Sequence, residues 1–302
     1  MEEELIVADK PYVIRKGAAR VLSLRRELID EVLDPKAEIE AIVRSKIRAD
    51  LVTFVDRPLC PSPPLPYFQD WDNRAILEIT SYDHWLMKQI PQQTRNKVRK
   101  AEKKGVTVHV EPFSDRLIHD LVDMFNESPF RQGRPNRYYG WNAEQVRRAW
   151  QTDLDRSVWI VAYHAGEMIG FIKLILGNGI ARTSGTIAKV AYRDRAPMNA
   201  ILAKSIEVCA GRGISHLVYG QFVYGTKGED SLTIFKVNNG FKRFDIPRWY
   251  IPLSVWGQTA LRLGLHKELI ELIPAPLLRM IRTIKNKWYQ GTVSRRLVEA
   301  KD

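Results

Sequence analysis

The stretch SVWIVAYHAGEMIGFIKLILGNGIARTSGTIAKV, residues 157–190, decides how the rest of the chain is interpreted. Its apolar runs are rich in β-branched and aromatic residues, which is typical of buried strands. Ala165-Gly166 and Gly177-Asn178-Gly179 separate the runs, and such short links containing glycine are typical of hairpin turns. The stretch therefore predicts a three-stranded meander, with strands at 157–164, 168–176 and 180–190.

The segments on both sides of the meander predict helices and further strands. Pro197 favours the start of a helix that runs to Gly211, because proline suits the first position of a helix. The other helices predicted in this part of the chain cover 94–104, 114–126, 142–153 and 229–238. The other strands predicted here cover 75–80, 106–110, 216–224 and 241–253.

The N-terminal part has a different pattern. Residues 17–48 carry apolar side chains at roughly helical spacing and predict helices that are interrupted at Asp34-Pro35, and a short strand follows at 51–55. Five prolines within residues 57–66 exclude a helix or a central strand and predict an extended connector. The chain is therefore predicted to have three parts: a helical, then proline-rich N-terminal extension at 1–74, a domain at 75–253 and a basic helical tail at 254–302.

Composition excludes several classes of protein. The 302 residues are 45% hydrophobic and contain no apolar run long enough to predict a transmembrane helix. The acidic start MEEELIVADK lacks a signal-peptide pattern, so we predict a cytoplasmic protein, with a peripheral membrane position left open. Two cysteines exclude a disulfide scaffold, and six histidines without ligand spacing predict that there is no metal site. The net charge of +12 predicts an anionic partner, either nucleic acid, a phosphorylated cofactor or a membrane surface.

From residue 106 onward, the order of predicted elements resembles the GNAT acyltransferase fold. TIAKVAYRDRAPMNAILAKSIEVCAGRGI is similar to the strand, loop and helix that hold the donor in that superfamily, and SLTIFKVNNGF to the helix and glycine before its last strand. The basic helix RNKVRKAEKKGV, Pro197, and Phe235-Lys236 followed by Gly240 resemble the FemABX-type branch, which transfers amino acids from aminoacyl-tRNA to peptidoglycan precursors. The resemblance implies an α/β (α+β) fold: a mixed, mostly antiparallel twisted sheet flanked by helices, with a helical N-terminal extension and C-terminal helices.

The resemblance also implies that a donor binds where the loop 193–196 leads into the helix at Pro197. A helix N-terminus attracts anions, and arginine adds charge and bidentate geometry for phosphate. The predicted donor-binding residues are Arg193, Arg195, Ala196, Met198, Asn199 and Phe235. Ala196 and Met198 stand where acyl-CoA enzymes of this superfamily usually carry glycine, so the donor is left open between acyl-CoA and aminoacyl-tRNA.

Lys236 is the leading catalytic candidate. It stands four residues before Gly240, where many GNAT enzymes have a tyrosine acid, and it matches a lysine that stabilises charge on the reacting ester in the FemABX-type branch. A lysine can neutralise a developing oxyanion, although most lysines are simply solvated on helices. Tyr219, to orient an acceptor amine, and Glu127, as a base, are the other catalytic candidates, with core packing as the alternative for the tyrosine.

The loop ESPFRQGRPNRYYGW, residues 127–141, combines arginines with aromatic residues, a composition enriched at binding surfaces. In the superfamily this region covers the acceptor, so the resemblance implies an amine acceptor, either a small molecule, a peptide or a protein. A long loop without a binding role is the alternative. Strand alternation predicts that Tyr219 and Gln221 share one face and that Tyr224 points to the other unless a bulge intervenes. The predicted acceptor-binding residues are Arg131, Arg134, Tyr138, Tyr139, Gln221 and Tyr224.

Basic residues gather in two segments. The helix at 94–104 is predicted to bind RNA or another phosphate-rich partner, with a solvated surface as the alternative. Its basic residues are Arg95, Lys97, Arg99, Lys100, Lys103 and Lys104. Residues 277–290 predict a basic amphipathic helix that either lies on an anionic membrane or packs on its own domain.

These residues predict an N-acyltransferase or aminoacyltransferase that moves a group from aminoacyl-tRNA or acyl-CoA to an amine by direct attack, without a covalent enzyme intermediate. The alternative is a catalytically inactive GNAT-like module that binds RNA or an anionic membrane surface. The acyl group, the acceptor and the oligomeric state are not predicted.

Overall fold

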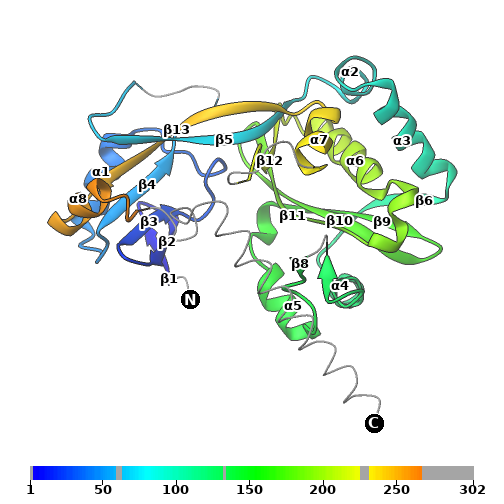
Figure 1. Cartoon of the computed structure of the whole chain (residues 1–302), viewed down its shortest axis with the longest axis horizontal. Helices are drawn as coiled ribbons and strands as arrows, with labels where there is room; N and C mark the ends of the chain where they lie inside the picture. The colour runs from blue at the N-terminus through cyan, green and yellow to red at the C-terminus, as the bar shows by residue number, and fades with distance from the viewer. Residues whose placement is uncertain (1–2, 59–62, 132–133, 225–230, 267–302) are drawn as a thin grey trace, which may run out of the picture. The chain divides into compact units, whose positions relative to one another are not determined.

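The computed structural model describes residues 3–58, 63–131, 134–224 and 231–266. Figure 1 shows its helices and strands. The strands are β1 (Glu3–Val7), β2 (Lys10–Lys16), β3 (Arg20–Leu24), β4 (Leu51–Val55), β5 (Phe68–Glu78), β6 (Val106–Glu111), β7 (Phe130–Arg131), β8 (Arg134–Pro135), β9 (Ser157–His164), β10 (Glu167–Leu176), β11 (Ile180–Ala188), β12 (His216–Gln221) and β13 (Lys242–Pro252). The helices are α1 (Pro35–Arg44), α2 (Tyr82–His84), η1 (Trp85–Gln89), α3 (Gln92–Lys103), α4 (Asp115–Phe125), α5 (Ala143–Trp150), η2 (Leu154–Arg156), η3 (Val190–Arg195), α6 (Pro197–Gly211), α7 (Ser231–Asn238) and α8 (Val255–Arg262).

The chain divides into two compact units. Unit 1 combines residues 1–77, 218–237 and 241–273, as far as these are described. Unit 2 combines residues 78–217, 238–240 and 274–302, again as far as they are described. The three parts predicted from the sequence, with boundaries at 74/75 and 253/254, stay a prediction.

In unit 1 the described strands lie in the order β1-β2-β3-β4-β13-β5. β3 and β4 run parallel, and the other neighbouring strands run antiparallel. β13, from the end of the described chain, pairs with β4 on one side and β5 on the other. The core beneath these strands includes Tyr12, Ile42 of α1, Phe54 and Trp249. The N-terminal strands therefore share a sheet with β13.

A half-buried ionic network lies on one face of β13 and β5. The Arg248 guanidinium contacts the carboxylates of Glu27 at 2.7 Å and Asp72 at 2.8 Å, and Arg74 also pairs with Asp72. Burial opposes the ionisation of Asp72, but the two arginines outweigh this effect and lower the pKa of its carboxyl. These arginines therefore neutralise charges of unit 1 itself.

In unit 2 the described strands lie in the order β11-β10-β9-β6, and all neighbours run antiparallel. Figure 1 shows α6 on one side of these strands and α4 and α5 on the other. Two glycines permit α6 and α5 to pack closely against these strands. A Cβ on Gly170 would lie 2.9 Å from Ile201 of α6, and a Cβ on Gly185 would lie 2.4 Å from the Trp150 ring of α5.

The predicted meander is confirmed as β9, β10 and β11. α6 begins at Pro197 and ends at Gly211, as the proline and the helical pattern predict. Ser114 and Asn142 cap α4 and α5 through their side-chain oxygens, and Asn142 forms a capping box with Gln145. Local signals thus define most of unit 2. The fold class, a mixed α/β protein with a mostly antiparallel sheet, is confirmed.

The helical interpretation of residues 17–48 is wrong over its first part. Residues 20–24 form β3, which pairs with β2 and runs parallel to β4. Only α1 is helical there, with the Asp34 side chain accepting hydrogen bonds from two backbone N–H groups of its first turn. Pairing with neighbouring strands outweighs the weak helical spacing, and the sequence pattern could not show these distant partners.

Two predicted features lie outside the described residues. These are the amphipathic helix at 277–290 and the middle of the proline-rich connector at 59–62. In the part of the tail that is described, α8 begins at the Ser254 cap. No described helix is long and apolar enough to cross a membrane.

Gly257 provides a test of how α8 packs against Asp50 and Leu51. A Cβ at this position would lie 1.9 Å from the carbonyl oxygen of Asp50, which directly precedes β4, so Gly257→Ala forces α8 away from the start of that strand. We expect the free energy of unfolding to fall by roughly 2–3 kcal/mol, measured by urea denaturation. Gly211→Ala is the control, because nothing lies within 4 Å of a Cβ there, and it should be neutral or slightly stabilising. Equal stability of Gly257→Ala and the unmodified protein would contradict the packing.

Candidate functional site

Lys236 lies at the centre of a polar cluster in unit 1. The side chain has no exposed surface, although it belongs to a short helix, α7. Its Nζ donates hydrogen bonds to the main-chain carbonyls of Gln221 and Phe222, the latter at 3.3 Å. The rings of Tyr224 and Tyr219 face the ammonium, with centroids at 4.6 and 5.8 Å. A buried cation needs such partners, so the solvated-lysine alternative does not apply here.

The end of β12 brings the two tyrosines to the same side. The predicted strand 216–224 ends at Gln221 instead, and Gly220 adopts φ +70°. A Cβ on Gly220 would lie 2.5 Å from the Tyr224 hydroxyl, so glycine is required both for the backbone angle and for the space. Strict alternation, which places Tyr224 opposite Tyr219, therefore does not hold, because the chain bends at this glycine.

Three other predicted residues lie near or within this cluster. Phe235 is half-buried, and its ring centroid lies 6.1 Å from that of Tyr219. Gln221 contributes its carbonyl to Lys236. Tyr224 is 44% exposed, so the cluster reaches the surface through this ring.

In unit 2 the predicted donor loop is η3 with Ala196. Ala196 adopts φ +52° before α6, the left-handed conformation that favours glycine. The chain therefore keeps the backbone shape of a glycine turn with an alanine, at a strain of order 1 kcal/mol. Arg193 is exposed, and Met198 is half-buried in the first turn of α6. Asn199 is buried, and its amide donates to Asn239 Oδ1 at 3.4 Å.

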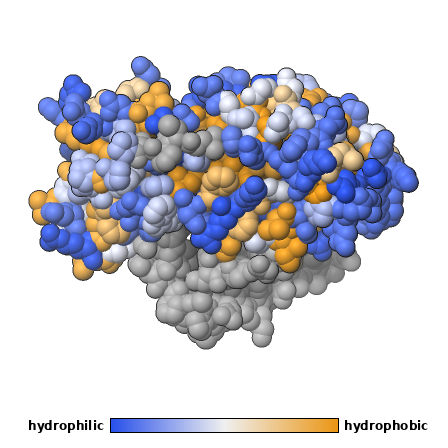
Figure 2. Space-filling view, turned by 90° about the horizontal axis from the view of Figure 1, so that it is seen from above, coloured by the Kyte–Doolittle hydropathy of each residue, from blue (hydrophilic) through white to orange (hydrophobic). Residues whose placement is uncertain are grey.

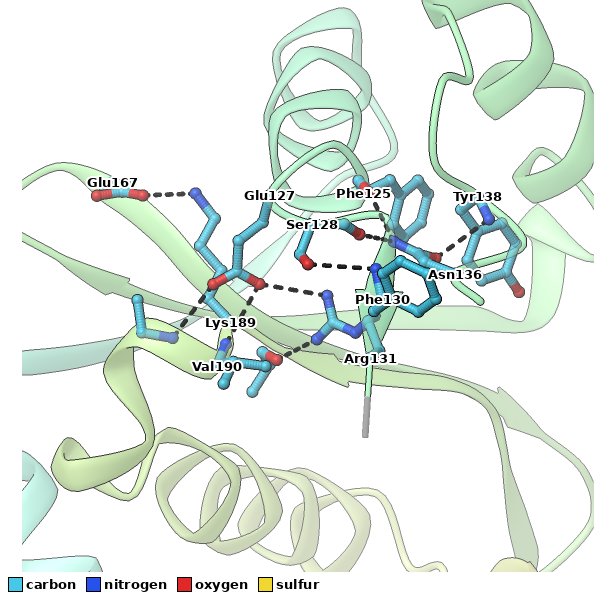
Figure 3. A network of polar contacts seen from close by, with 12 residues as sticks. Phe125, Glu127, Ser128, Phe130, Arg131, Asn136, Tyr138, Glu167, Lys189 and Val190 are labelled. Atoms are coloured by element: carbon cyan, nitrogen blue, oxygen red, sulfur yellow. Dashed lines mark hydrogen bonds and ion pairs between the residues drawn. The ribbon is translucent and has the colours of Figure 1, made fainter. Parts of the chain in front are cut away.

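Glu127 anchors the start of η3 (Figure 3). Its two carboxylate oxygens accept hydrogen bonds from the backbone N–H groups of Val190 and Ala191, each at 3.2 Å. Arg131 Nη1 lies 3.5 Å from the same carboxylate, and Arg131 Nη2 donates to the Ala188 carbonyl. Burial lowers the pKa of the Arg131 guanidinium, partly offset by Glu127. These contacts favour a positioning role for Glu127, and its role as a base stays a prediction.

A second anchor holds the far side of the same loop. Glu167 pairs with Lys189 at 2.5 Å and accepts a hydrogen bond from the Tyr192 hydroxyl. Figure 3 shows the Lys189 ion pair beside the Glu127 network. Lys189 and Tyr192 flank Val190 and Ala191, the two residues that Glu127 holds. The carboxylates of Glu127 and Glu167 therefore both fix this loop.

The predicted acceptor loop is organised by Asn136, which the sequence did not single out. Asn136 is 5% exposed, and its amide donates to the carbonyls of Phe125 and Ser128 at 2.7 and 3.0 Å. Its Oδ1 accepts from the Tyr138 N–H at 3.1 Å. The Tyr138 ring then stacks on Phe125 at 4.6 Å, which is a packing role. Tyr139 is half-buried, and the side chain of Arg134 is outside the described part.

The predicted basic helix is α3, and its charges have different environments. Arg95 donates to the carbonyls of Met87 and Ile90, so it holds the preceding π-helix. Lys104 pairs with Asp194 of η3 at 2.6 Å and lowers the pKa of that carboxyl by donating a hydrogen bond to it. The exposed basic residues are Lys97, Arg99, Lys100 and Lys103. Figure 2 shows hydrophilic residues gathered at the right, over the end of unit 2 that carries α3.

A bulge in β11 is a further feature that sequence alone did not show. Lys173 of β10 pairs with Gly185, but Leu174 pairs with Thr183, which leaves Ser184 as the extra residue. A bulge releases backbone groups from the strand ladder and often lies next to active sites. Ser184 is exposed, and the only sequence signal was the small-residue run TSGT.

Residues 89–230 match the family model described as "Acetyltransferase (GNAT) domain". This part of the chain is therefore similar to a GNAT domain. The predicted resemblance to the GNAT superfamily is thereby confirmed, and the domain type supports acyl or aminoacyl transfer in general. No curated protein sequence matches the chain.

The fold similarity to solved structures covers more of the chain than the family model does. FemX is 12% identical, with a TM-score of 0.60 and coverage of 84% of this chain and 86% of FemX. The C-terminal domain (DUF2156) of a protein assigned as a lysylphosphatidylglycerol synthetase from Agrobacterium fabrum is 12% identical, with a TM-score of 0.59 and coverage of 87% and 86%. L-PGS from Bacillus licheniformis is 14% identical, with a TM-score of 0.56 and the same coverage. At these identities the likeness to FemX shows a shared fold.

Within the described ranges, no three His, Cys, Asp or Glu side chains gather as metal ligands would. The prediction of a metal-free GNAT domain stays a prediction.

Glu127→Ala tests the anchor of the predicted donor loop. Without the carboxylate, the N–H groups of Val190 and Ala191 lose their acceptors, so we expect their hydrogen exchange to accelerate by about tenfold or more. The measurement is amide exchange by mass spectrometry. Asp123→Ala, an exposed acidic residue on α4, is the control and should leave this peptide unchanged. Unchanged exchange in Glu127→Ala would show that the anchor is unnecessary.

Proposed function

We propose that the protein is an N-acyltransferase or aminoacyltransferase that moves an acyl or aminoacyl group from a donor ester or thioester to an amine by direct attack. The buried ammonium of Lys236 is the observation that carries the proposal. Carbonyl oxygens and ring faces fix the cation, so little reorganisation is needed when negative charge develops on a reacting carbonyl. Tyr219 and Tyr224 wall the same cluster and are proposed to guide the amine.

The donor is proposed to bind at η3 and the start of α6. Helix N-termini favour anions, and Arg193 and Arg195 supply further positive charge there. The Arg195 guanidinium lies 5.8 Å from the Tyr192 ring centroid and donates to the Lys104 carbonyl at 3.2 Å, so it is held in place. The backbone N–H of Ser184, the extra residue of the bulge, is proposed to help polarise the donor carbonyl.

The acceptor is proposed to lie against the loop 127–141. Arg131 and Tyr139 are two half-buried members of that loop, and both carry polar groups for recognition. Tyr138 supports the loop through its packing on Phe125. The amine must reach the donor carbonyl unprotonated, and the group that accepts its proton is left for experiment.

Aminoacyl-tRNA is the donor that the charge distribution favours. α3 presents exposed basic residues, and its C-terminal end contacts the donor loop through the Lys104–Asp194 pair. A polyanion bound along α3 would therefore meet the donor loop directly. One structural neighbour is named for lysylphosphatidylglycerol, an aminoacylated lipid, so peripheral contact with an anionic membrane through residues 277–290 is part of the proposal.

The second candidate function is a GNAT-like module that binds RNA or an anionic membrane without catalysis. The engagement of both Glu127 oxygens in backbone hydrogen bonds favours it, because the predicted base is occupied. Such a module needs α3 and tolerates loss of the Lys236 charge.

Lys236→Met separates the two functions. Methionine keeps most of the buried volume but removes the cation, so we expect turnover to fall by about 10²–10³-fold. The assay follows release of CoA from acetyl-CoA, or of tRNA from lysyl-tRNA, with hydroxylamine as the probe amine and the uncatalysed rate subtracted. Lys173→Met is the matched control, because Lys173 is also buried and bound by carbonyls, of Trp150 and Thr152. Full turnover in Lys236→Met would refute the catalytic role and favour the binding module.

Neutralising α3 tests the donor. The triple variant of Lys97, Lys100 and Lys103→Gln should weaken tRNA binding and reduce the slope of log affinity against log salt by about 2, since each lost phosphate contact contributes about 0.7–0.9. The measurement is fluorescence anisotropy of labelled tRNA at several salt concentrations. A triple variant at Lys36, Arg44 and Lys46→Gln removes the same charge from exposed positions in and beside α1 and is the control. Tight acetyl-CoA binding that persists at high salt, together with no effect of the α3 variant, would instead identify acyl-CoA as the donor.

A further inference from the structure

Asn73, in the middle of β5, holds the segment that supplies the Lys236 carbonyls. Its Oδ1 accepts a hydrogen bond from the Val223 N–H at 2.7 Å, and its main-chain carbonyl accepts from the Phe222 N–H at 3.2 Å. Two consecutive residues after β12 are thus fixed by one residue that lies 150 positions earlier in the chain. Phe222 is the same residue whose carbonyl accepts from Lys236.

α7 fixes this carbonyl from the other side. Thr233 is 4% exposed, and its hydroxyl donates to the Phe222 carbonyl at 3.3 Å. Thr233 and Lys236 are three positions apart on α7, so they lie on the same side of the helix. Both side chains therefore reach one carbonyl, whose position is set by the N–H bonds to Asn73.

We propose that Asn73 is a positioning residue for Lys236: its side-chain oxygen fixes the 222–223 backbone, which in turn holds the ammonium in place. The inference rests on the proposed function of Lys236. Asn73 acts on Lys236 through the backbone of Phe222 and Val223. Any residue at position 73 could accept the hydrogen bond from the Phe222 N–H through its main-chain carbonyl. The hydrogen bond from the Val223 N–H requires an acceptor on a side chain as long as that of asparagine.

The bond to Val223 decides how firmly the segment is held. Gly220 adopts a positive φ just before it, and Tyr224, which follows, is partly exposed. β12 ends at Gln221, so beyond that residue the chain no longer has a strand ladder to fix it. Removing one acceptor leaves a backbone N–H without its partner and favours local opening of the segment.

The test is a short pulse of acetic anhydride on the folded full-length protein, followed by chymotryptic digestion and mass spectrometry of each lysine. Asn73→Ala should raise the rate of Lys236 acetylation, relative to exposed Lys97, by about tenfold, because the carbonyls that bury the ammonium open more often. Asn73→Asp keeps an acceptor oxygen and should return the rate to within about threefold of the unmodified protein. Asp245, the cross-strand partner of Asn73, already pairs with Arg243 at 2.8 Å, which limits repulsion with the new carboxylate.

Lys173 is the internal control for a general loss of stability. It is 1% exposed and held by carbonyls of unit 2, so global unfolding exposes it together with Lys236. An increase confined to Lys236 supports the positioning role. An unchanged Lys236 rate in Asn73→Ala, or equal increases at Lys236 and Lys173, would overturn it.

The two proposals fail in different ways. Acetylation of Lys236 reports its position whether or not the protein is a transferase. If Asn73→Ala exposes Lys236 while Lys236→Met retains turnover, the positioning role stands and the proposed function fails. If Lys236→Met loses turnover while Asn73→Ala leaves acetylation unchanged, the proposed function stands and the role of Asn73 fails.

Discussion

The burial of one ammonium group, that of Lys236, constrains the surrounding structure of unit 1. A charge without exposed surface is tolerated only where oxygens and ring faces replace its water. Here that requirement explains why β12 stops at Gln221, why Gly220 adopts a positive φ, and why Tyr224 turns back over that glycine. Each feature is costly or unusual alone, and together they form the partners that the cation needs.

Unit 2 solves a different problem, which is to hold an exposed loop in one conformation. η3 lacks a core of its own, and its residues are half-buried or exposed. Glu127 accepts two of its backbone N–H groups, Glu167 binds Lys189 and Tyr192, and Lys104 pairs with Asp194. Side-chain carboxylates and an ammonium thus replace the packing that would otherwise order the loop. A pre-ordered loop binds an anionic donor at a smaller entropic cost.

The sequence predicts those parts of the fold that depend on neighbouring residues. Hairpin links, the Asn142 cap and Pro197 act over a few positions, and the elements that they delimit are confirmed. β3 was missed because its partners, β2 and β4, decide its conformation. The same reason explains the site: Lys236 stands out by its place before Gly240, whereas Asn73 and Ser184 acquire their roles through β12 and β10, which no local pattern reveals.

The net charge of +12 indicates a partner only once the basic groups with partners inside the protein are set aside. Arg74 and Arg248 neutralise Asp72 and Glu27, Arg95 holds helical carbonyls, and Lys236 is buried. None of these groups lies on the surface where an extended polyanion would bind. The exposed face of α3 keeps its charge, because one acidic residue, Glu102, stands among its basic ones. Like charges along a helix repel one another mildly, and a bound polyanion relieves that repulsion. The excess charge therefore argues for an extended anion along α3, since a compact donor at η3 would need only the arginines of that loop.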